Sequence, residues 1–240
     1  MSDLSNSWLD KKIKTDPPSQ VPAYLEETYW WAYVHPNAVA FFERQWLINL
    51  ILWGNYRRLR DAVLDELGEG IQGSTLQVAC AYGDFSVKLA ERIAKVGSLD
   101  IVDVLPIQLN NLQRKLPLHA SVRIIQGDSA KLKFANARYD QAILFFLLHE
   151  QPGTIRSKTL SEALRVLKPG GKLVIVDYHK PAFFHPLRYL FPPVLRLLEP
   201  FALDLWQREI ESWLPKNFAP RQFSKQTLFG GLYQKVVICV

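Results

Sequence analysis

The sequence predicts an α/β protein built on a doubly wound sheet of seven strands, the last two of which form a β-hairpin. Short apolar runs typical of buried strands alternate with helix-like segments through the middle of the chain, which favours a mainly parallel sheet. Two strand-like segments separated by Gly230-Gly231 follow near the C-terminus, as in a β-hairpin. Hydrophobic residues make up 48% of the 240 residues and charged residues 22%, which is enough apolar material for a packed core.

Each element follows from a local pattern. Before the sheet, apolar residues recur at the spacing of one helical face, at Phe42, Trp46, Leu50 and Trp53, and this helical segment fades at Gly68. The five strands before the hairpin are expected at 76–80, 99–103, 122–125, 141–147 and 173–176. The helices between them are expected at 85–95, 107–115 and 157–167, and the hairpin strands at 222–229 and 232–240. A turn at 168–171 precedes the fifth strand.

These elements divide the chain into a flexible tail at 1–22, an N-terminal helical cover at 23–70, an α/β core at 71–180, a helical lid at 181–218 and the hairpin at 219–240. Pro192-Pro193 is expected to break or kink the lid segment, because a proline inside a helix costs about 3 kcal/mol, and the segment is interpreted as two short helices that form a lid on the sheet. The lid carries an apolar stripe at helical spacing, at Leu187, Leu190, Phe191, Val194, Leu195 and Leu198. With Arg188 and Arg196 beside it, the stripe either contacts lipid or packs on the core, and the surplus of Trp, Phe and Arg favours lipid.

Charge and cysteine content limit the classes of function. Lys and Arg outnumber Asp and Glu by 29 to 23, a net charge of +6 that favours anionic partners, either lipid head groups or nucleic acid. The sequence lacks the aromatic and basic arrangement of an RNA-binding module, so nucleic acid is not expected. Cys80 and Cys239 have neither zinc-ligand nor disulfide-framework spacing, which fits a reducing compartment. No signal-peptide pattern or membrane-spanning run is recognised.

Three features follow successive strands, where the carboxyl ends of a parallel sheet form the usual ligand site. The first is the turn Ala79-Cys80-Ala81-Tyr82-Gly83-Asp84 after the first strand. The second is Asp103, about 20 residues further on, whose carboxylate can accept both hydroxyls of a ribose. The third is Gly127-Asp128-Ser129, where a carboxylate can accept an adenine amine. Together they predict a nucleoside-containing cofactor at this edge of the sheet.

With Arg165-Val166-Leu167-Lys168-Pro169-Gly170-Gly171 before the fifth strand, these features resemble the class I S-adenosylmethionine-dependent methyltransferases, whose fold is Rossmann-like. The resemblance implies S-adenosylmethionine as cofactor, bound by Ala79, Tyr82, Gly83, Asp103, Val104, Asp128 and Ser129. The first turn departs from the family pattern, because Gln77 replaces an acid and Ala79 and Ala81 replace two glycines. Either the loop has drifted around the same cofactor, or the methionine part is held differently for different chemistry.

The segments that flank the core resemble particular groups within this class of methyltransferases. Segments 46–60, 199–202 and 229–235 are similar to ubiquinone and menaquinone biosynthesis methyltransferases. Segments 29–31, 35–36, 44–46 and 78–84 resemble the rhodoquinone-biosynthesis (RquA) family. This resemblance implies an enzyme of methyltransferase-like fold that replaces a methoxy group of ubiquinone with an amino group from S-adenosylmethionine and needs Mn²⁺. It also implies a peripheral membrane protein on the cytoplasmic side of the bacterial inner membrane. An ordinary quinone methyltransferase and a non-catalytic, cofactor-binding scaffold are the alternatives, and the sequence predicts no oligomeric state.

Polar residues after the fourth and fifth strands are the catalytic candidates, namely His149, Tyr178 and His179. Because both strands end at the same edge, His149, Asp177 and His179 can converge, and a carboxylate with two imidazoles suits Mn²⁺. Either histidine is expected to act as a base, although His149 has the alternative role of capping its loop. Residues before the first helix, where related enzymes cover the cofactor, are the candidates for substrate contact: Tyr29, Tyr33 and His35. Cys80 is expected to be a small buried residue rather than a nucleophile.

Overall fold

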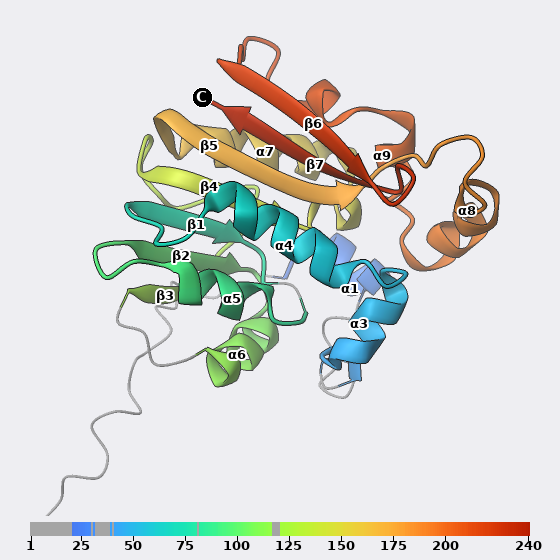
Figure 1. The fold of residues 1–240 in the computed structure, drawn as a ribbon, viewed down its shortest axis with the longest axis horizontal. Helices are drawn as coiled ribbons and strands as arrows, with labels where there is room; N and C mark the ends of the chain where they lie inside the picture. Colours follow the sequence, from blue (N-terminus) through green and yellow to red (C-terminus); the bar gives the residue numbers. More distant parts are fainter. Residues whose placement is uncertain (1–20, 30, 32–38, 40, 81, 117–120) are drawn as a thin grey trace, which may run out of the picture.

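The computed structural model describes residues 21–29, 31, 39, 41–80, 82–116 and 121–240. They form a seven-stranded sheet with the strand order β3-β2-β1-β4-β5-β7-β6 (Figure 1). Strands β1 to β5 pair in parallel, whereas β7 pairs antiparallel with both β5 and β6. The predicted doubly wound sheet with its C-terminal hairpin is confirmed.

The observed elements match the predicted order in the core. The strands are β1 (Ser74–Val78), β2 (Ser98–Asp103), β3 (Val122–Gln126), β4 (Tyr139–Phe145), β5 (Leu167–Tyr178), β6 (Gln222–Leu228) and β7 (Tyr233–Cys239). The α-helices are α1 (Ala23–Tyr29), α3 (Gln45–Ile51), α4 (Tyr56–Leu67), α5 (Phe85–Arg92), α6 (Pro106–Lys115), α7 (Gly153–Arg165), α8 (Leu187–Leu198) and α9 (Asp204–Gln207). Two 3₁₀ turns, η2 (Leu148–Glu150) and η3 (Ile210–Trp213), complete the described elements.

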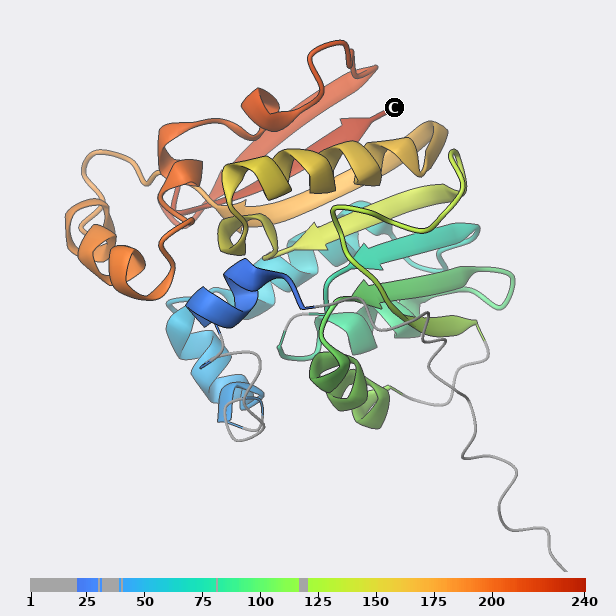
Figure 2. The ribbon, with the colours of Figure 1, turned by 180° about the vertical axis from the view of Figure 1, so that it is seen from behind.

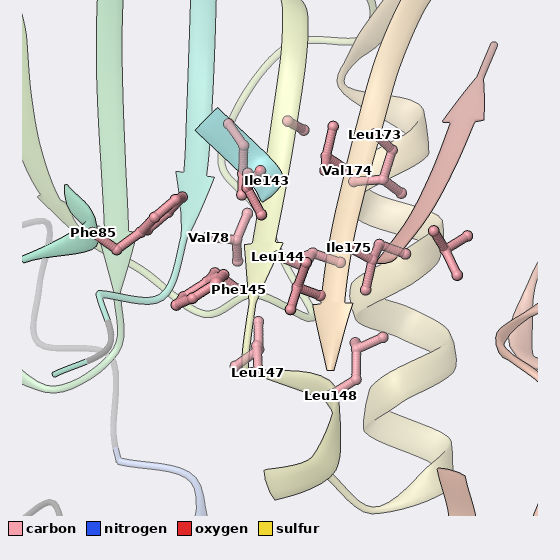
Figure 3. Close-up of a cluster of buried hydrophobic side chains, with 14 of the residues drawn as sticks. Val78, Phe85, Ile143, Leu144, Phe145, Leu147, Leu148, Leu173, Val174 and Ile175 are labelled. Atoms are coloured by element: carbon pink, nitrogen blue, oxygen red, sulfur yellow. The ribbon is translucent and has the colours of Figure 1, made fainter. Parts of the chain in front are cut away.

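The core lies on both faces of the central strands. β1, β4 and β5 are buried along most of their length because helices cover both faces of this part of the sheet. α4 and α5 cover one face and α7 covers the other (Figures 1 and 2). Phe85 of α5 and Phe145 of β4, both drawn in Figure 3, stack with their ring centroids 4.3 Å apart. This packing fixes the carboxyl end of β4, shortly before His149.

Two helices, α3 and α4, replace the single N-terminal helical segment that the apolar spacing predicted. Trp53 and Gly54 between them take left-handed φ values of 53° and 77°. The side-chain amide of Asn55 donates to the Trp53 carbonyl at 2.8 Å and closes the turn. A left-handed residue with a Cβ costs about 1–2 kcal/mol. The edge-to-face contact between the Trp53 and Phe191 rings, with centroids 5.9 Å apart, offsets part of this cost.

α8 is one helix with Pro192 and Pro193 inside it, so the predicted break into two short helices is wrong. The prolines lack the amide protons that would bond to the carbonyl oxygens of Arg188 and Tyr189. Tyr189 is 64% exposed, so solvent can reach this side of the helix. The inward side chains of α8 are buried in the core and hold the helix in place. None of the helices in the described ranges is long and apolar enough to cross a membrane.

β5 begins earlier than predicted. Residues 168–171 were expected to form a turn, but they belong to the strand, where the pairing with β4 jumps from Tyr139–Leu167 to Gln141–Lys172. Gly170 takes a φ of 81° within this irregular stretch. The glycines therefore allow a bulge in the strand, which the sequence pattern alone cannot distinguish from a turn.

Candidate functional site

A cavity of about 570 Å³ lies beyond the carboxyl ends of the parallel strands. Helices α1, α3 and α8 gather around this end of the sheet (Figure 2). The wall is mainly apolar, and its polar members include Asp103, Gln108, Asp128, Ser129, His149, Glu150, Gln151 and Glu199. An apolar cavity with a few converging polar groups is the usual form of a small-molecule site.

The turn after β1 keeps a glycine-like shape although it lacks the expected glycines. Ala79 takes a left-handed φ of 67° and lines the cavity. The fully buried side-chain amide of Gln77 donates to the Ala79 carbonyl at 3.0 Å and to the Ser86 hydroxyl at 2.8 Å. Gln77 therefore stabilises the turn from beneath. The Ala79 Cβ occupies cavity wall where a glycine would leave space.

Gly83 serves the start of α5. It takes a φ of 92°, and a Cβ at this position would lie 2.5 Å from the Tyr56 hydroxyl. That hydroxyl accepts the amide protons of Asp84 and Phe85, at 2.9 and 3.0 Å, and donates to the Asp84 carboxylate at 3.0 Å. Gly83 is not among the described residues that line the cavity, so its role is to fit the turn beneath Tyr56.

Asp103 ends β2 and lines the cavity. Its carboxylate accepts the amide protons of Cys80 and Leu105, each at 2.9 Å, and the Cys80 thiol at 3.3 Å. Burial raises the pKa of Asp103, and these hydrogen bonds oppose the shift. The Val104 backbone also bonds to this carboxylate, so the turn itself already uses most of its roughly four acceptor positions, and the two ribose hydroxyls that were predicted would have to share them.

Cys80 is a protonated, buried thiol. Burial, followed by the nearby charge of Asp103, raises the pKa of Cys80 well above its usual value. The thiolate is the nucleophilic form of cysteine, so this environment supports the interpretation of Cys80 as a small buried residue.

Four further residues that were predicted to bind the cofactor line the same cavity: Tyr82, Val104, Asp128 and Ser129. The Tyr82 ring stacks on Phe42 with centroids 5.9 Å apart, and its hydroxyl accepts the Gln108 amide at 2.9 Å. The Ser129 hydroxyl accepts the Gln151 amide at 2.9 Å. Together with Ala79 and Asp103, all of the predicted cofactor residues except Gly83 line the cavity.

His149 lines the cavity and is hydrogen-bonded to Asp177 behind it. Nδ1 of His149 lies 2.9 Å from Oδ1 of Asp177. Asp177 also accepts the amide protons of Leu148 at 2.8 Å and Tyr178 at 2.7 Å, so its carboxylate is held by the backbone of both strand ends. His149 is 5% exposed and Asp177 is fully buried. This pairing fixes the orientation of the imidazole ring.

Two more carboxylates lie on the other side of the His149 ring. Nε2 of His149 is 3.9 Å from Glu150 and 4.0 Å from Glu199. Burial disfavours the imidazolium, but Asp177, Glu199 and Glu150 together raise the pKa of His149 to about 9. Burial raises the pKa of Glu199, although the charge of His149 opposes that shift. His149 is therefore a cation at neutral pH, which suits a proton donor rather than the base that the sequence predicted.

His179 lies apart from this group. Its Nδ1 is 2.8 Å from the Gly231 carbonyl and its Nε2 is 2.9 Å from the Lys225 amine, in the wall of a second cavity of about 280 Å³. Among the residues that the structure describes, no group of three or more His, Cys, Asp and Glu side chains is arranged to hold a metal ion. Of the predicted Mn²⁺ ligands, His149 and Asp177 lie together, whereas His179 does not join them.

Three predicted catalytic or substrate-contacting tyrosines have different outcomes. Tyr178 lines the cavity beside His149, with ring centroids 5.0 Å apart, and burial raises the pKa of its hydroxyl well above the usual value. Tyr29 is fully buried against Phe201 and is not among the described lining residues. Tyr33 and His35 lie outside the described residues.

A buried arginine connects the His149 segment to the lid. Arg156 is fully buried and donates to the carbonyl oxygens of Leu148 at 2.8 Å, Gln151 at 2.9 Å and Phe201 at 2.9 Å. Its guanidinium lies 4.5 Å from the centre of the Trp213 ring. A single side chain therefore joins η2, the end of α8 and η3.

Sequence reasoning placed Glu150 beside His149 without giving it a role of its own, and it missed the roles of Glu199 and Arg156. Glu150 directly follows His149, and this adjacency is a usable local signal. Glu199 belongs to a segment noted only for its resemblance to quinone methyltransferases. Arg156 looks like an ordinary charged residue on a helix, because its burial depends on segments distant in sequence.

The strand order, the acid at the end of β2 and the adjoining cavity define a class I S-adenosylmethionine-dependent methyltransferase-like protein. A methyltransferase of Aquifex aeolicus, 20% identical, has the same fold with a TM-score of 0.52 over 86% of this chain and 98% of its own. The N-methyltransferase NodS of Bradyrhizobium japonicum, solved with S-adenosyl-L-homocysteine, is 14% identical with a TM-score of 0.56 over 76% of this chain and 85% of its own. Within this class, the chain belongs to the ubiE/COQ5 methyltransferase family, which matches residues 44–235.

Curated relatives agree with this family. A demethylmenaquinone methyltransferase of Bacillus licheniformis is 23% identical over 78% of this chain and 79% of its own length. A ubiquinone/menaquinone biosynthesis C-methyltransferase of Haemophilus ducreyi is 27% identical over 60% of this chain, and the match spans 55% of that protein. The chain therefore resembles enzymes that act on quinones.

Proposed function

We propose that the protein is an S-adenosylmethionine-dependent enzyme of quinone biosynthesis that replaces a ring methoxy group of ubiquinone with an amino group. The observation that carries this proposal is one cavity whose mainly apolar wall contains all the predicted cofactor residues except Gly83 together with His149, which is hydrogen-bonded to the buried Asp177. The names of the relatives support a quinone substrate. The altered turn at 77–81 and the rhodoquinone-like segments favour amination over methylation.

In this proposal the cofactor lies along the ends of β1, β2 and β3. Asp103 is placed for the ribose, and Asp128 and Ser129 are placed for the adenine. S-adenosylmethionine supplies the nitrogen nucleophile through its α-amino group. The apolar wall excludes water from the quinone ring, so the quinone lies toward α3 and α8.

The polar side chains of the wall then have distinct tasks. Protonated His149 gives its proton to the departing methoxide, which leaves as methanol when the ring carbon–oxygen bond breaks and the carbon–nitrogen bond forms. The Tyr178 hydroxyl, protonated over the whole physiological range, donates a hydrogen bond to a ring carbonyl. A carboxylate of Glu150 or Glu199 accepts the proton that the nitrogen loses. Separating the nitrogen from the rest of the donor is a later reaction.

The resemblance also implies Mn²⁺. The described side chains do not form a ligand set for it, and we assign no step to the metal. We therefore predict only the effect of the metal on activity: amino transfer should stop when a chelator removes the metal and resume when Mn²⁺ is restored.

Isotope labelling tests the reaction. Purified protein is incubated with ubiquinone and labelled S-adenosylmethionine. The label is ¹⁵N in the α-amino group in one experiment and ¹³C in the methyl group in the other. The mass of the quinone is then measured by mass spectrometry. Amination puts ¹⁵N and no ¹³C into the quinone. The His149→Gln variant, which keeps a polar side chain but cannot carry the proton, should lose most of this product while still binding the cofactor.

Carbon methylation is the second candidate, because the curated relatives are named methyltransferases. Methyl label in a demethylated quinone, with no ¹⁵N transfer to ubiquinone, would establish it and overturn amination. If the quinone is unchanged under every donor and metal condition, the remaining interpretation is a non-catalytic protein that binds the cofactor.

A further inference from the structure

Exposed apolar side chains are concentrated in two parts of the described chain. Apart from Val96, every large apolar side chain that is strongly exposed falls within 41–53 or 183–198. A folded protein exposes single apolar residues everywhere, but a contiguous group of this kind marks a contact surface. We call the exposed side chains of these two segments the apolar surface.

α8 shows why this surface needs a covering. Its inward side chains, Leu187, Phe191 and Leu195, are buried in the core. Its outward side chains are apolar as well, with Leu190 68% and Leu197 80% exposed. Arg196 is exposed as well, but an outer side with this many apolar side chains is normally covered, so the outer side of α8 lacks its natural surroundings in the isolated chain.

α3 repeats this pattern and meets α8. Leu47 and Ile48 are buried, whereas Trp46 is 57% and Leu50 65% exposed. Both helices project beyond the same end of the sheet in both views (Figures 1 and 2). The turn after α3 contacts α8 through the Trp53 and Phe191 rings, 5.9 Å apart.

The apolar surface also surrounds an entrance to the cavity. Leu50, Ile51 and Trp53 on one side and Val194 and Leu198 on the other are strongly exposed, yet they also line the cavity. A ligand entering between α3 and α8 would therefore remain in contact with apolar side chains from the surface to the His149–Asp177 pair.

Basic groups border the apolar surface. Arg44 precedes α3 and Arg196 is exposed on α8. The second cavity, of about 280 Å³, is lined by Lys180, Arg188 and Arg208 and by one carboxylate, Glu209, which pairs with Lys225, and it lies next to the exposed Phe183-Phe184 pair. Trp206 also lines it, and its buried indole Nε1 has no hydrogen-bond partner among the described residues. Cationic groups beside an apolar face match a bilayer with anionic head groups.

We propose that the apolar surface of α3 and α8 docks on an anionic lipid bilayer and that the quinone passes directly from the bilayer into the cavity between the two helices. A second protein copy fits less well, because it would close the entrance and would have to match the basic border. The identity of the passing molecule rests on the proposed function, whereas the contact with lipid does not.

Vesicle flotation tests the surface. The double variant Leu190→Ser/Leu197→Ser removes two outward side chains that do not line the cavity, and Val96→Ser is the matched control, because Val96 is 79% exposed outside the surface. Binding to vesicles of phosphatidylcholine with phosphatidylglycerol should fall at least tenfold in the double variant and stay within twofold in the control. Thermal unfolding confirms that both variants fold. Equal binding by the double variant, or a dimer in light scattering that the double variant abolishes, would overturn the proposal.

A second pair of assays separates this inference from the proposed function. The double variant should convert a short-chain quinone in solution as fast as the wild type and convert long-chain ubiquinone in vesicles at least tenfold more slowly. Equal rates in vesicles would refute direct passage from the bilayer. A wild type that converts neither quinone but still floats with vesicles would refute the proposed reaction and leave the lipid contact intact.

Discussion

At the scale of single residues, two strained positions stand at the edge of the cavity. Ala79 after β1 and Phe146 after β4 take left-handed φ values of 67° and 54°, and both line the cavity. Such conformations cost about 1–2 kcal/mol each for residues with a Cβ. They persist where the surroundings fix them, as the buried Gln77 amide fixes Ala79.

Asp103 is the first residue to test. Asp103→Ala should abolish measurable cofactor binding, because it removes the ribose acceptor and leaves the Cys80 and Leu105 amides unpaired. Each unpaired buried amide costs roughly 1–3 kcal/mol, so stability should fall as well.

Asp103→Asn separates these two effects, since it keeps an acceptor oxygen for one amide. We expect calorimetry to show at least tenfold weaker binding of S-adenosylmethionine and urea unfolding to show a smaller loss of stability than for Asp103→Ala. An affinity within twofold of wild type in both variants would place the ribose elsewhere.

Because of His149, the free energy of unfolding should fall as the pH becomes alkaline. Its pKa of about 9 in the folded protein exceeds the unfolded value of 6.5. The stabilisation is therefore complete below about pH 6.5 and is lost as the pH rises through 9. Urea midpoints should decline over this window in the wild type and less steeply in His149→Gln. A ring titration near pH 6.5 by NMR would contradict the assigned charge state.

At the scale of elements, the strands were the most predictable part. Buried strands such as β2 and β4 are short apolar runs, and their signal is local. The break between α3 and α4 was not predictable, because the left-handed Trp53 is held by a ring from α8, far away in sequence. The continuity of α8 was missed for the same reason, since tertiary packing outweighed the two prolines.

The candidate site likewise contains residues whose position the sequence predicts and residues whose position it does not. Asp103, Asp128 and Ser129 follow strand ends, so their position at the cavity follows from topology. His179 also follows a strand end, but its ring turns to Gly231 and Lys225, and no sequence pattern specifies that direction. Glu199 enters the site from the end of α8, whose placement depends on the complete fold.

Tyr56 links α4 to the cofactor turn. Tyr56→Phe should destabilise the protein by about 1–2 kcal/mol, because the amides of Asp84 and Phe85 at the start of α5 lose their acceptor. Tyr189→Phe is the control, since its hydroxyl bonds only to the exposed Phe183 carbonyl. Urea unfolding compares the two variants, and equal stability would show that solvent replaces the Tyr56 hydroxyl.

At the scale of the whole molecule, the cofactor should stabilise the fold by mass action. A ligand at 100 times its Kd that binds only the folded state adds about 2.7 kcal/mol. At roughly 2–4 °C per kcal/mol for a chain of this size, the Tm should rise by about 5–10 °C with S-adenosylmethionine. Calorimetric scans should show no rise with methionine alone, since it lacks the ribose and adenine. Equal shifts with both compounds would indicate binding outside the predicted cofactor site.

Arg156 should couple the opening of two segments, which kinetic measurements would reveal. Because one guanidinium holds the carbonyls of Leu148, Gln151 and Phe201, the His149 segment and the segment after α8 share their hydrogen-bond donor. Neither can loosen without depriving the other of partners in a buried environment. Amide protons in η2 and in the segment after α8 should therefore exchange with deuterated solvent at a common rate, as one cooperative unit.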